Sequence, residues 1–164
     1  MTRLWQRNLL GAAVSVVALT VIVYTSLWSD WSDYLQSTDP QLVVAARESG
    51  EVAGTTWRVE STRYLNTSAD RFEPELPEGT LLHVVTVESA AASPSGCAGL
   101  ITDGSRRWSA ETVGGYGPLP PDGIHSFCGK SGLTQFSFLL PSEVTPTAVD
   151  ITDRLGRIQV RLLL

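Results

Sequence analysis

The last eight residues, Arg157–Leu164 (RIQVRLLL), carry the clearest structural pattern in the chain. Aliphatic residues occupy every even position from 158 to 164, and Arg or Gln occupies positions 157, 159 and 161. Successive side chains of a β-strand point to opposite faces of the sheet, so this alternation predicts a strand with one buried face and one solvated face. The buried face requires a second layer of structure to cover it.

Seven further runs of β-branched and aromatic residues precede this strand, and turns rich in Gly, Pro and Asp separate them. The predicted strands are Leu42–Glu48, Thr55–Leu65, Leu81–Ser89, Gly99–Thr102, Arg107–Ala110, Thr134–Leu140, Ala148–Thr152 and Arg157–Leu163. Asp153–Gly156 is typical of a hairpin turn between the last two strands. Phe136 and Phe138 stand two positions apart in one predicted strand, and Trp57 stands in another. These positions favour packing of the three side chains in the core. Seven or eight short strands without a helical segment predict an all-β sandwich.

Upstream lies Asn8–Trp28 (NLLGAAVSVVALTVIVYTSLW), an almost unbroken apolar run with Arg3 and Arg7 before it. A helix rises about 1.5 Å per residue, so about 20 apolar residues cross a hydrocarbon core of about 30 Å. The positive-inside tendency places residues 1–7 in the cytoplasm and the rest of the chain outside. The run therefore predicts a single-pass protein of the cell membrane whose C-terminal domain is extracytoplasmic.

A cleaved secretory signal is the alternative, because it also combines a basic start with an apolar run. The run is longer than the usual signal core, and Val23–Trp28 lacks a pair of small residues ahead of a cleavage site. We therefore expect an uncleaved anchor. Residues 29–41 are expected to form a short juxtamembrane helix that Pro40 stops, followed by the β-domain over residues 42–164.

The net charge of the exported part argues against nucleic acid as a partner. All 17 acidic residues follow Trp28, against 10 of the 12 basic residues, so the exported part carries a net charge of 10 − 17 = −7. Binding to nucleic acid depends on neutralising phosphates with Lys and Arg, so this surface is not expected to bind nucleic acid.

The only two cysteines, Cys97 and Cys128, both lie on the oxidising side of the predicted topology. A disulfide between them is the default expectation. The alternative is that the cysteines form a metal site or a catalytic thiol, but the chain has no CxxC motif to support it.

Two stretches are expected to be loops. Asn66–Gly79 (NTSADRFEPELPEG) is acidic, and Val113–Gly132 (VGGYGPLPPDGIHSFCGKSG) is rich in Gly and Pro. Long ordered loops are often functional, so both are candidate surfaces for binding a partner. The predicted contact residues are Tyr116, Leu119, Ile124, Asp70, Glu73 and Glu75.

No segment carries a convincing catalytic or cofactor motif. Gly129–Ser131 resembles the end of a phosphate-binding loop, but Ile124 stands where that motif requires glycine. His125 lies near Ser126 and Cys128, yet the nucleophile elbow of hydrolases is missing. His83 shares a strand face with valines and is expected to be structural. We therefore expect no catalytic residues, no metal and no cofactor.

Several features together resemble a known group of proteins. They are the N-terminal anchor, the Gly54-x-x-Trp57-x-Val59 strand, the Leu-Pro-x-Gly-Thr sequence at residues 76–80 before a valine-rich strand, and the Cys97/Cys128 pair. The chain resembles the exported immunoglobulin-like domains of actinobacteria, including the DUF4352-like and immunoprotective-antigen-like groups. The resemblance implies an immunoglobulin-like sandwich and no known chemistry.

The expected function is a non-catalytic binding or scaffolding role at the cell envelope, for instance as an accessory subunit of a membrane complex. Its partners would be the membrane, through Asn8–Trp28, and an envelope protein. The alternative is an extracytoplasmic solute or metal sensor or carrier that uses the loop around His125 and Cys128.

Overall fold

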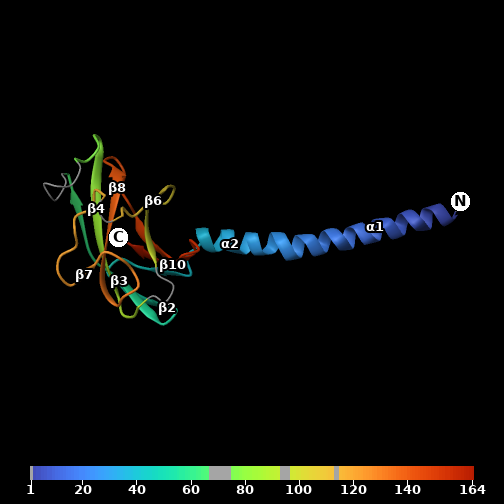
Figure 1. Ribbon diagram of the computed structural model, residues 1–164, viewed down its shortest axis with the longest axis horizontal. Helices are drawn as coiled ribbons and strands as arrows, with labels where there is room; N and C mark the ends of the chain where they lie inside the picture. Colours follow the sequence, from blue (N-terminus) through green and yellow to red (C-terminus); the bar gives the residue numbers. More distant parts are fainter. Residues whose placement is uncertain (1, 67–74, 93–96, 113–114) are drawn as a thin grey trace. The chain divides into compact units, whose positions relative to one another are not determined.

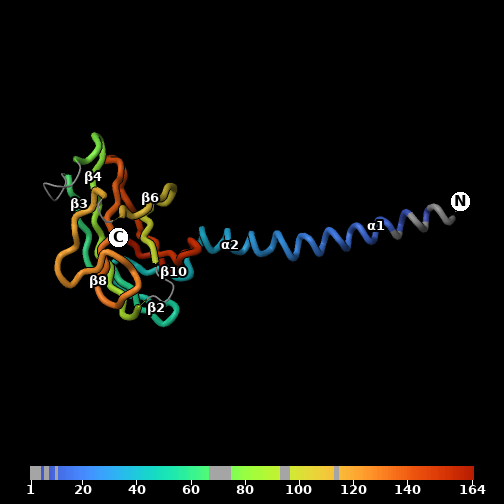
Figure 2. The backbone as a smooth tube through the Cα atoms, in the orientation of Figure 1, coloured from blue at the N-terminus to red at the C-terminus, as the bar shows by residue number. Residues whose placement is uncertain are grey.

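The computed structural model describes residues 2–66, 75–92, 97–112 and 115–164 (Figures 1 and 2). The chain divides into two compact units, Met1–Thr38 and Asp39–Leu164, and each is described by itself.

The first unit is helical throughout. It consists of α1 (Thr2–Ile22), a π-helical turn (Val23–Leu27) and α2 (Trp28–Thr38), which ends two residues before Pro40. Thr20 and Thr25 donate their hydroxyls to the helix's own carbonyls at Val16 and Val21, at 2.8 Å in each case. These bonds satisfy the hydroxyls without any partner, as an apolar surrounding requires.

Among the described residues, one helical stretch is long and apolar enough to cross a membrane. It is Gly11–Thr38, whose most apolar 18-residue window has a mean hydropathy of 1.8 and no side chain buried inside the molecule. A signal sequence near an N-terminus would meet the same criteria. Toward the end of this stretch the Tyr24 and Trp28 rings stack, with their centroids 6.2 Å apart.

The second unit is a sandwich of two five-stranded sheets (Figure 1). Its strands are β1 (Leu42–Val44), β2 (Ser49–Val52), β3 (Thr55–Leu65), β4 (Thr80–Ser89), β5 (Ala98–Thr102), β6 (Arg107–Ser109), β7 (Ile124–His125), β8 (Gly132–Pro141), β9 (Ala148–Thr152) and β10 (Ile158–Leu163). One sheet has the order β1-β10-β9-β5-β6 and the other has the order β2-β3-β4-β8-β7.

This order is that of an immunoglobulin-like sandwich, which confirms the predicted fold class. β3, β4 and β8 take the places of strands A, B and E, and β5, β9 and β10 take those of C, F and G. β7 occupies the position of strand D but runs parallel to β8. β6 pairs with β5 as an additional edge strand, and β1 runs parallel to β10 at the opposite edge.

The core lies between the two sheets. It contains the predicted Trp57, Phe136 and Phe138, together with the even-numbered aliphatic residues of β10 from 158 to 162. Gly99 lies against the Phe136 ring. A Cβ atom added at Gly99 would come within 2.7 Å of this ring. A larger residue at this position would force the two sheets apart.

Two strands beyond the expected eight were not visible in the sequence pattern. The predicted strand Leu42–Glu48 ends at Val44, because Arg47 has a φ of 67° and the Glu48 amide donates to the Ala45 carbonyl. β2 then forms a hairpin with β3 through Ala53 and Gly54, both at positive φ as this turn requires. The other additional strand, β7, has only two residues.

The opposite face of the first sheet holds a buried ion pair. The Asp150 carboxylate is fully buried and accepts two hydrogen bonds from Arg161, at 2.6 and 2.8 Å. Arg107 lies 3.8 Å away on the other side. Loss of Arg161 would leave the buried carboxylate with only the more distant Arg107 to compensate its charge, so the pair favours the observed register of β9 against β10.

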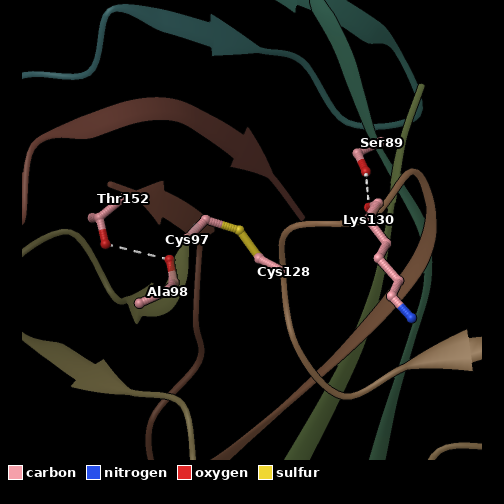
Figure 3. The surroundings of a disulfide bond; sticks show 6 residues. All are labelled: Ser89, Cys97, Ala98, Cys128, Lys130 and Thr152. Carbon is pink, nitrogen blue, oxygen red and sulfur yellow. Dashed lines mark hydrogen bonds between the residues drawn. A yellow bond between two sulfur atoms is a disulfide. The ribbon is translucent and has the colours of Figure 1, made fainter. Parts of the chain in front are cut away.

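Cys97 and Cys128 form a disulfide, as predicted (Figure 3). Their Cα atoms are 5.1 Å apart, within the range that suits this bond. Cys97 directly precedes β5 in one sheet, and Cys128 lies between β7 and β8 of the other, so the bond joins the two sheets. The neighbouring Lys130 carbonyl accepts a hydrogen bond from Ser89 at 3.3 Å.

The double variant Cys97→Ala/Cys128→Ala should unfold more easily than the wild type. The disulfide closes a loop with a sequence separation of 31, and the chain-entropy model gives about 3 to 4 kcal/mol for a loop of this length. The free energy of unfolding, measured by denaturant titration, checks this value. Two alkylatable thiols in the denatured, unreduced wild type would contradict the bond itself.

Candidate functional site

The segment of residues 115–131, here called the strap, connects β6 to β8 and contains β7. It lies against β8, in keeping with the neighbouring traces in Figure 2. Just ahead of it the Glu111 amide donates to the Ser137 carbonyl at 2.7 Å, and Gln135 Nε2 donates to the Pro118 carbonyl at 2.8 Å. Contact is so close at Gly117 that an added Cβ would lie 2.7 Å from the Ser137 Cβ.

These contacts change the predicted role of the stretch. Gln135 and Ser137 lie on the face of β8 opposite to the core residues Phe136 and Phe138, yet both are buried. The strap covers them, and the Pro118 carbonyl satisfies the Gln135 amide that would otherwise be buried without a partner. The predicted loop is therefore partly a structural cover for the second sheet.

The predicted contact residues of the strap differ in exposure. Leu119 is 69% exposed, whereas Tyr116 and Ile124 are half-buried. Phe127, which the sequence analysis did not select, is 68% exposed. No sequence pattern distinguishes an outward-pointing Phe at this position. The exposed apolar groups of the strap are thus Leu119 and Phe127.

Two hollows adjoin the strap. The first has a volume of about 30 Å³ between Pro118, Ser126 and Ser137, which suits a water molecule. The second measures about 230 Å³ and is lined by Ile124, His125, Ser126, Phe127, Cys128 and Lys130. Small-molecule sites usually have volumes of about 300 to 1,000 Å³, so neither hollow has the dimensions of such a site.

Cys128 cannot act as a metal ligand in the alternative site predicted around His125 and Cys128. The Cys128 sulfur is bonded to Cys97, so it offers no thiolate to a metal ion. Within the part of the chain that the structure describes, His, Cys, Asp and Glu form no group of three that could hold a metal ion.

The acidic loop is only partly described. Glu75 is exposed, as a contact residue would be. Asp70 and Glu73 lie outside the described residues, so their predicted role stays a prediction.

His83 is the buried titratable group of the second sheet. Its ring stacks on Tyr64 with centroids 4.2 Å apart, and its Nε2 shares a hydrogen bond with the Thr62 hydroxyl. Nδ1 is buried without a hydrogen-bond partner, and the side chain is 1% exposed. Burial disfavours the charged ring and lowers the pKa of His83 to about 4. The expected structural role of His83 agrees with these surroundings.

The stability of the domain should fall between pH 6.5 and pH 4. The unfolded chain binds a proton at His83 near pH 6.5, but the folded chain does so only near pH 4. Stability is therefore fully present above pH 6.5 and decreases as the pH falls through this window, by up to about 3 kcal/mol. Denaturant titrations at several pH values measure the loss.

The variant His83→Leu should lose this part of the pH dependence, because it has no group to protonate. The variant His125→Gln is the matched control, since it removes the other histidine and should keep the loss assigned to His83. An unchanged pH profile in His83→Leu would show that other groups cause it.

No family model and no curated protein matches the chain. Among solved structures, the chain is similar to an uncharacterized β-sandwich protein from Clostridium difficile. The two share 10% sequence identity over 77% of this chain and 95% of that chain, with a TM-score of 0.37. The fold assignment rests on the sheet topology given above.

Proposed function

We propose that this chain is a single-pass protein of the cell membrane that displays a non-catalytic binding or scaffolding domain on the outer side. Residues 1–7 would lie in the cytoplasm, and the domain would contact another component of the envelope, for instance as an accessory subunit of a membrane complex. The observation that carries the proposal is the apolar helix followed closely by a disulfide-linked sandwich: three residues separate Thr38 from Leu42.

The exposure of the helix supports an anchor. Its most apolar window has no side chain buried inside the molecule. Lipid is the simplest cover for such a helix, because every backbone group in it is satisfied internally. The disulfide supports an extracytoplasmic domain, because such bonds persist in oxidising compartments.

The strap is the proposed contact surface. Leu119 and Phe127 expose large apolar groups, while Pro118, Pro120 and Pro121 restrict the backbone around Leu119. A stiff backbone lowers the entropy cost of binding. The resemblance to exported immunoglobulin-like domains of actinobacteria agrees with this role, and we retain it as part of the proposal.

The mature protein should keep its N-terminus if the helix is an anchor. Intact-mass analysis of the protein purified from membranes should give the mass of the whole chain, and a protease added to intact cells should reach the sandwich but not residues 1–7. A mature chain that begins between Thr25 and Pro40 would show that the helix is a cleaved signal.

The double variant Leu119→Ser/Phe127→Ser should weaken partner binding without weakening the fold. Both side chains are more than two-thirds exposed, so their loss removes little buried apolar area. The melting temperature should therefore stay within about 2 °C of the wild type, since exposed substitutions usually change stability by less than about 0.5 kcal/mol. Recovery of co-purified envelope proteins, compared quantitatively with the wild type, should fall.

The matched control is Leu155→Ser, which removes another exposed leucine, from the turn between β9 and β10. It should leave recovery unchanged. If the strap variant is stable and recovers every partner in full, the strap is not the contact surface.

A further inference from the structure

The strand β3 is longer than its neighbour β2. β2 pairs only with Thr55–Arg58, whereas β3 continues to Leu65 and stays paired with β4 on its other side. On the side of β2, residues 60–65 therefore have no strand partner in the part of the chain that the structure describes. The side chains from Glu60 to Tyr64 are all exposed. We call residues 60–65 the open edge.

β8 also extends beyond its neighbour β7, but the Glu111 amide and the strap lie against that part of it. The edge strands themselves are short. β1 and β6 have three residues each, β2 has four and β7 has two. Very short edge strands are one way in which proteins avoid unwanted strand pairing. The open edge is longer than any of them and contains no proline or lysine. Its protection against strand pairing is limited to the charges of Glu60 and Arg63 and to a bulge at its start.

A groove runs beside the open edge. It has a volume of about 610 Å³ and is lined by Ala46, Arg47, Val59, Glu60, Ser61, Thr62, Leu163 and Leu164. Val59 and the two leucines offer an apolar floor at the point where a β-bulge between Val59 and Ser61 shifts the register of β3 against β4. Unpaired strand edges beside side-chain pockets are the features that proteins use to bind extended peptides.

The charges around the open edge favour an acidic partner. Arg47 and Arg63 are exposed, and neither takes part in an ion pair within the described chain, whereas Arg58 holds Glu60 at 2.9 Å. A second copy of this chain would bring both Glu60 and Arg63 to the same edge, whereas an acidic segment would bring only charges opposite to those of the two arginines. Repulsion from the more distant negative surface is screened beyond about 8 to 10 Å at physiological salt. Of the nearby carboxylates, Glu60 is paired with Arg58 and Glu48 is exposed beside Arg47.

We propose that the open edge binds an acidic, extended segment of a partner protein as an additional β-strand. Backbone hydrogen bonds to residues 60–65 would hold the segment, and an apolar side chain would enter the groove at Val59 and Leu163. Carboxylates on the opposite face of the segment would face Arg63, and a carboxylate at its end would face Arg47, which lines the groove. The proposal goes beyond the strap, because β7 and the strap lie at the opposite edge of the same sheet from β2.

A capped seven-residue peptide of alternating Glu and Val tests this with the full-length protein in nonionic detergent. The peptide should bind, and hydrogen exchange at residues 60–65 should slow when it does. The same peptide N-methylated at every residue keeps the charges and side chains but has no backbone N–H to donate. It should bind at least tenfold more weakly, and so should a peptide of alternating Lys and Val.

The double variant Arg47→Glu/Arg63→Glu should weaken binding of the Glu/Val peptide about tenfold, because each exposed ion pair contributes up to about 1 kcal/mol. The matched control Arg154→Glu reverses another exposed arginine that has no described ion pair, in the turn between β9 and β10, and should bind normally.

Three results would overturn the proposal. They are no binding at millimolar peptide, equal binding of the N-methylated peptide, and self-association of the protein through residues 60–65 in place of peptide binding. None of them bears on the strap, because the partner recovery measured with the Leu119 and Phe127 variant is independent of this edge.

Discussion

The pairing of β4 with β8 is the constraint on which the rest of the sandwich depends. The two strands are in register from Thr80 opposite Pro141 to Ser89 opposite Gly132. This register places Val85 opposite Phe136 on the core face, and it places Val84 opposite Ser137 on the other face. Both strands are buried on both faces over most of their length, so each face needs its own cover. The opposite sheet covers one, and the strap covers the part of the other around Ser137.

The same constraint explains how far the sequence predicts the fold. β10 has one buried face, and its strict alternation identifies it at once. β4 has two buried faces, and accordingly it shows a nearly continuous apolar run, which also predicts a strand. β2 and β7 are too short to show a period, and the turn before β3 uses Ala53 at a positive φ, where glycine or asparagine would have signalled a hairpin.

The candidate site was less predictable, because it depends on packing between segments that are distant in sequence. The Gly and Pro content of residues 115–131 predicts turns correctly, but it says nothing of the contact between Gly117 and Ser137. The Asp150–Arg161 pair is equally hidden, since only the register of β9 against β10 brings the two side chains together. Exposed groups such as Phe127 and the open edge of β3 appear only when the neighbours of each strand are known.

The disulfide changes the outcome of a single proteolytic cut in the domain. It closes a covalent ring that contains β5, β6 and most of the strap. A single cut in the backbone anywhere between Cys97 and Cys128 opens the ring but leaves the two fragments joined through sulfur. β8, β9 and β10 would then still be tethered to the helix that precedes the sandwich. The exposed strap can thus be nicked without releasing the C-terminal half of the domain.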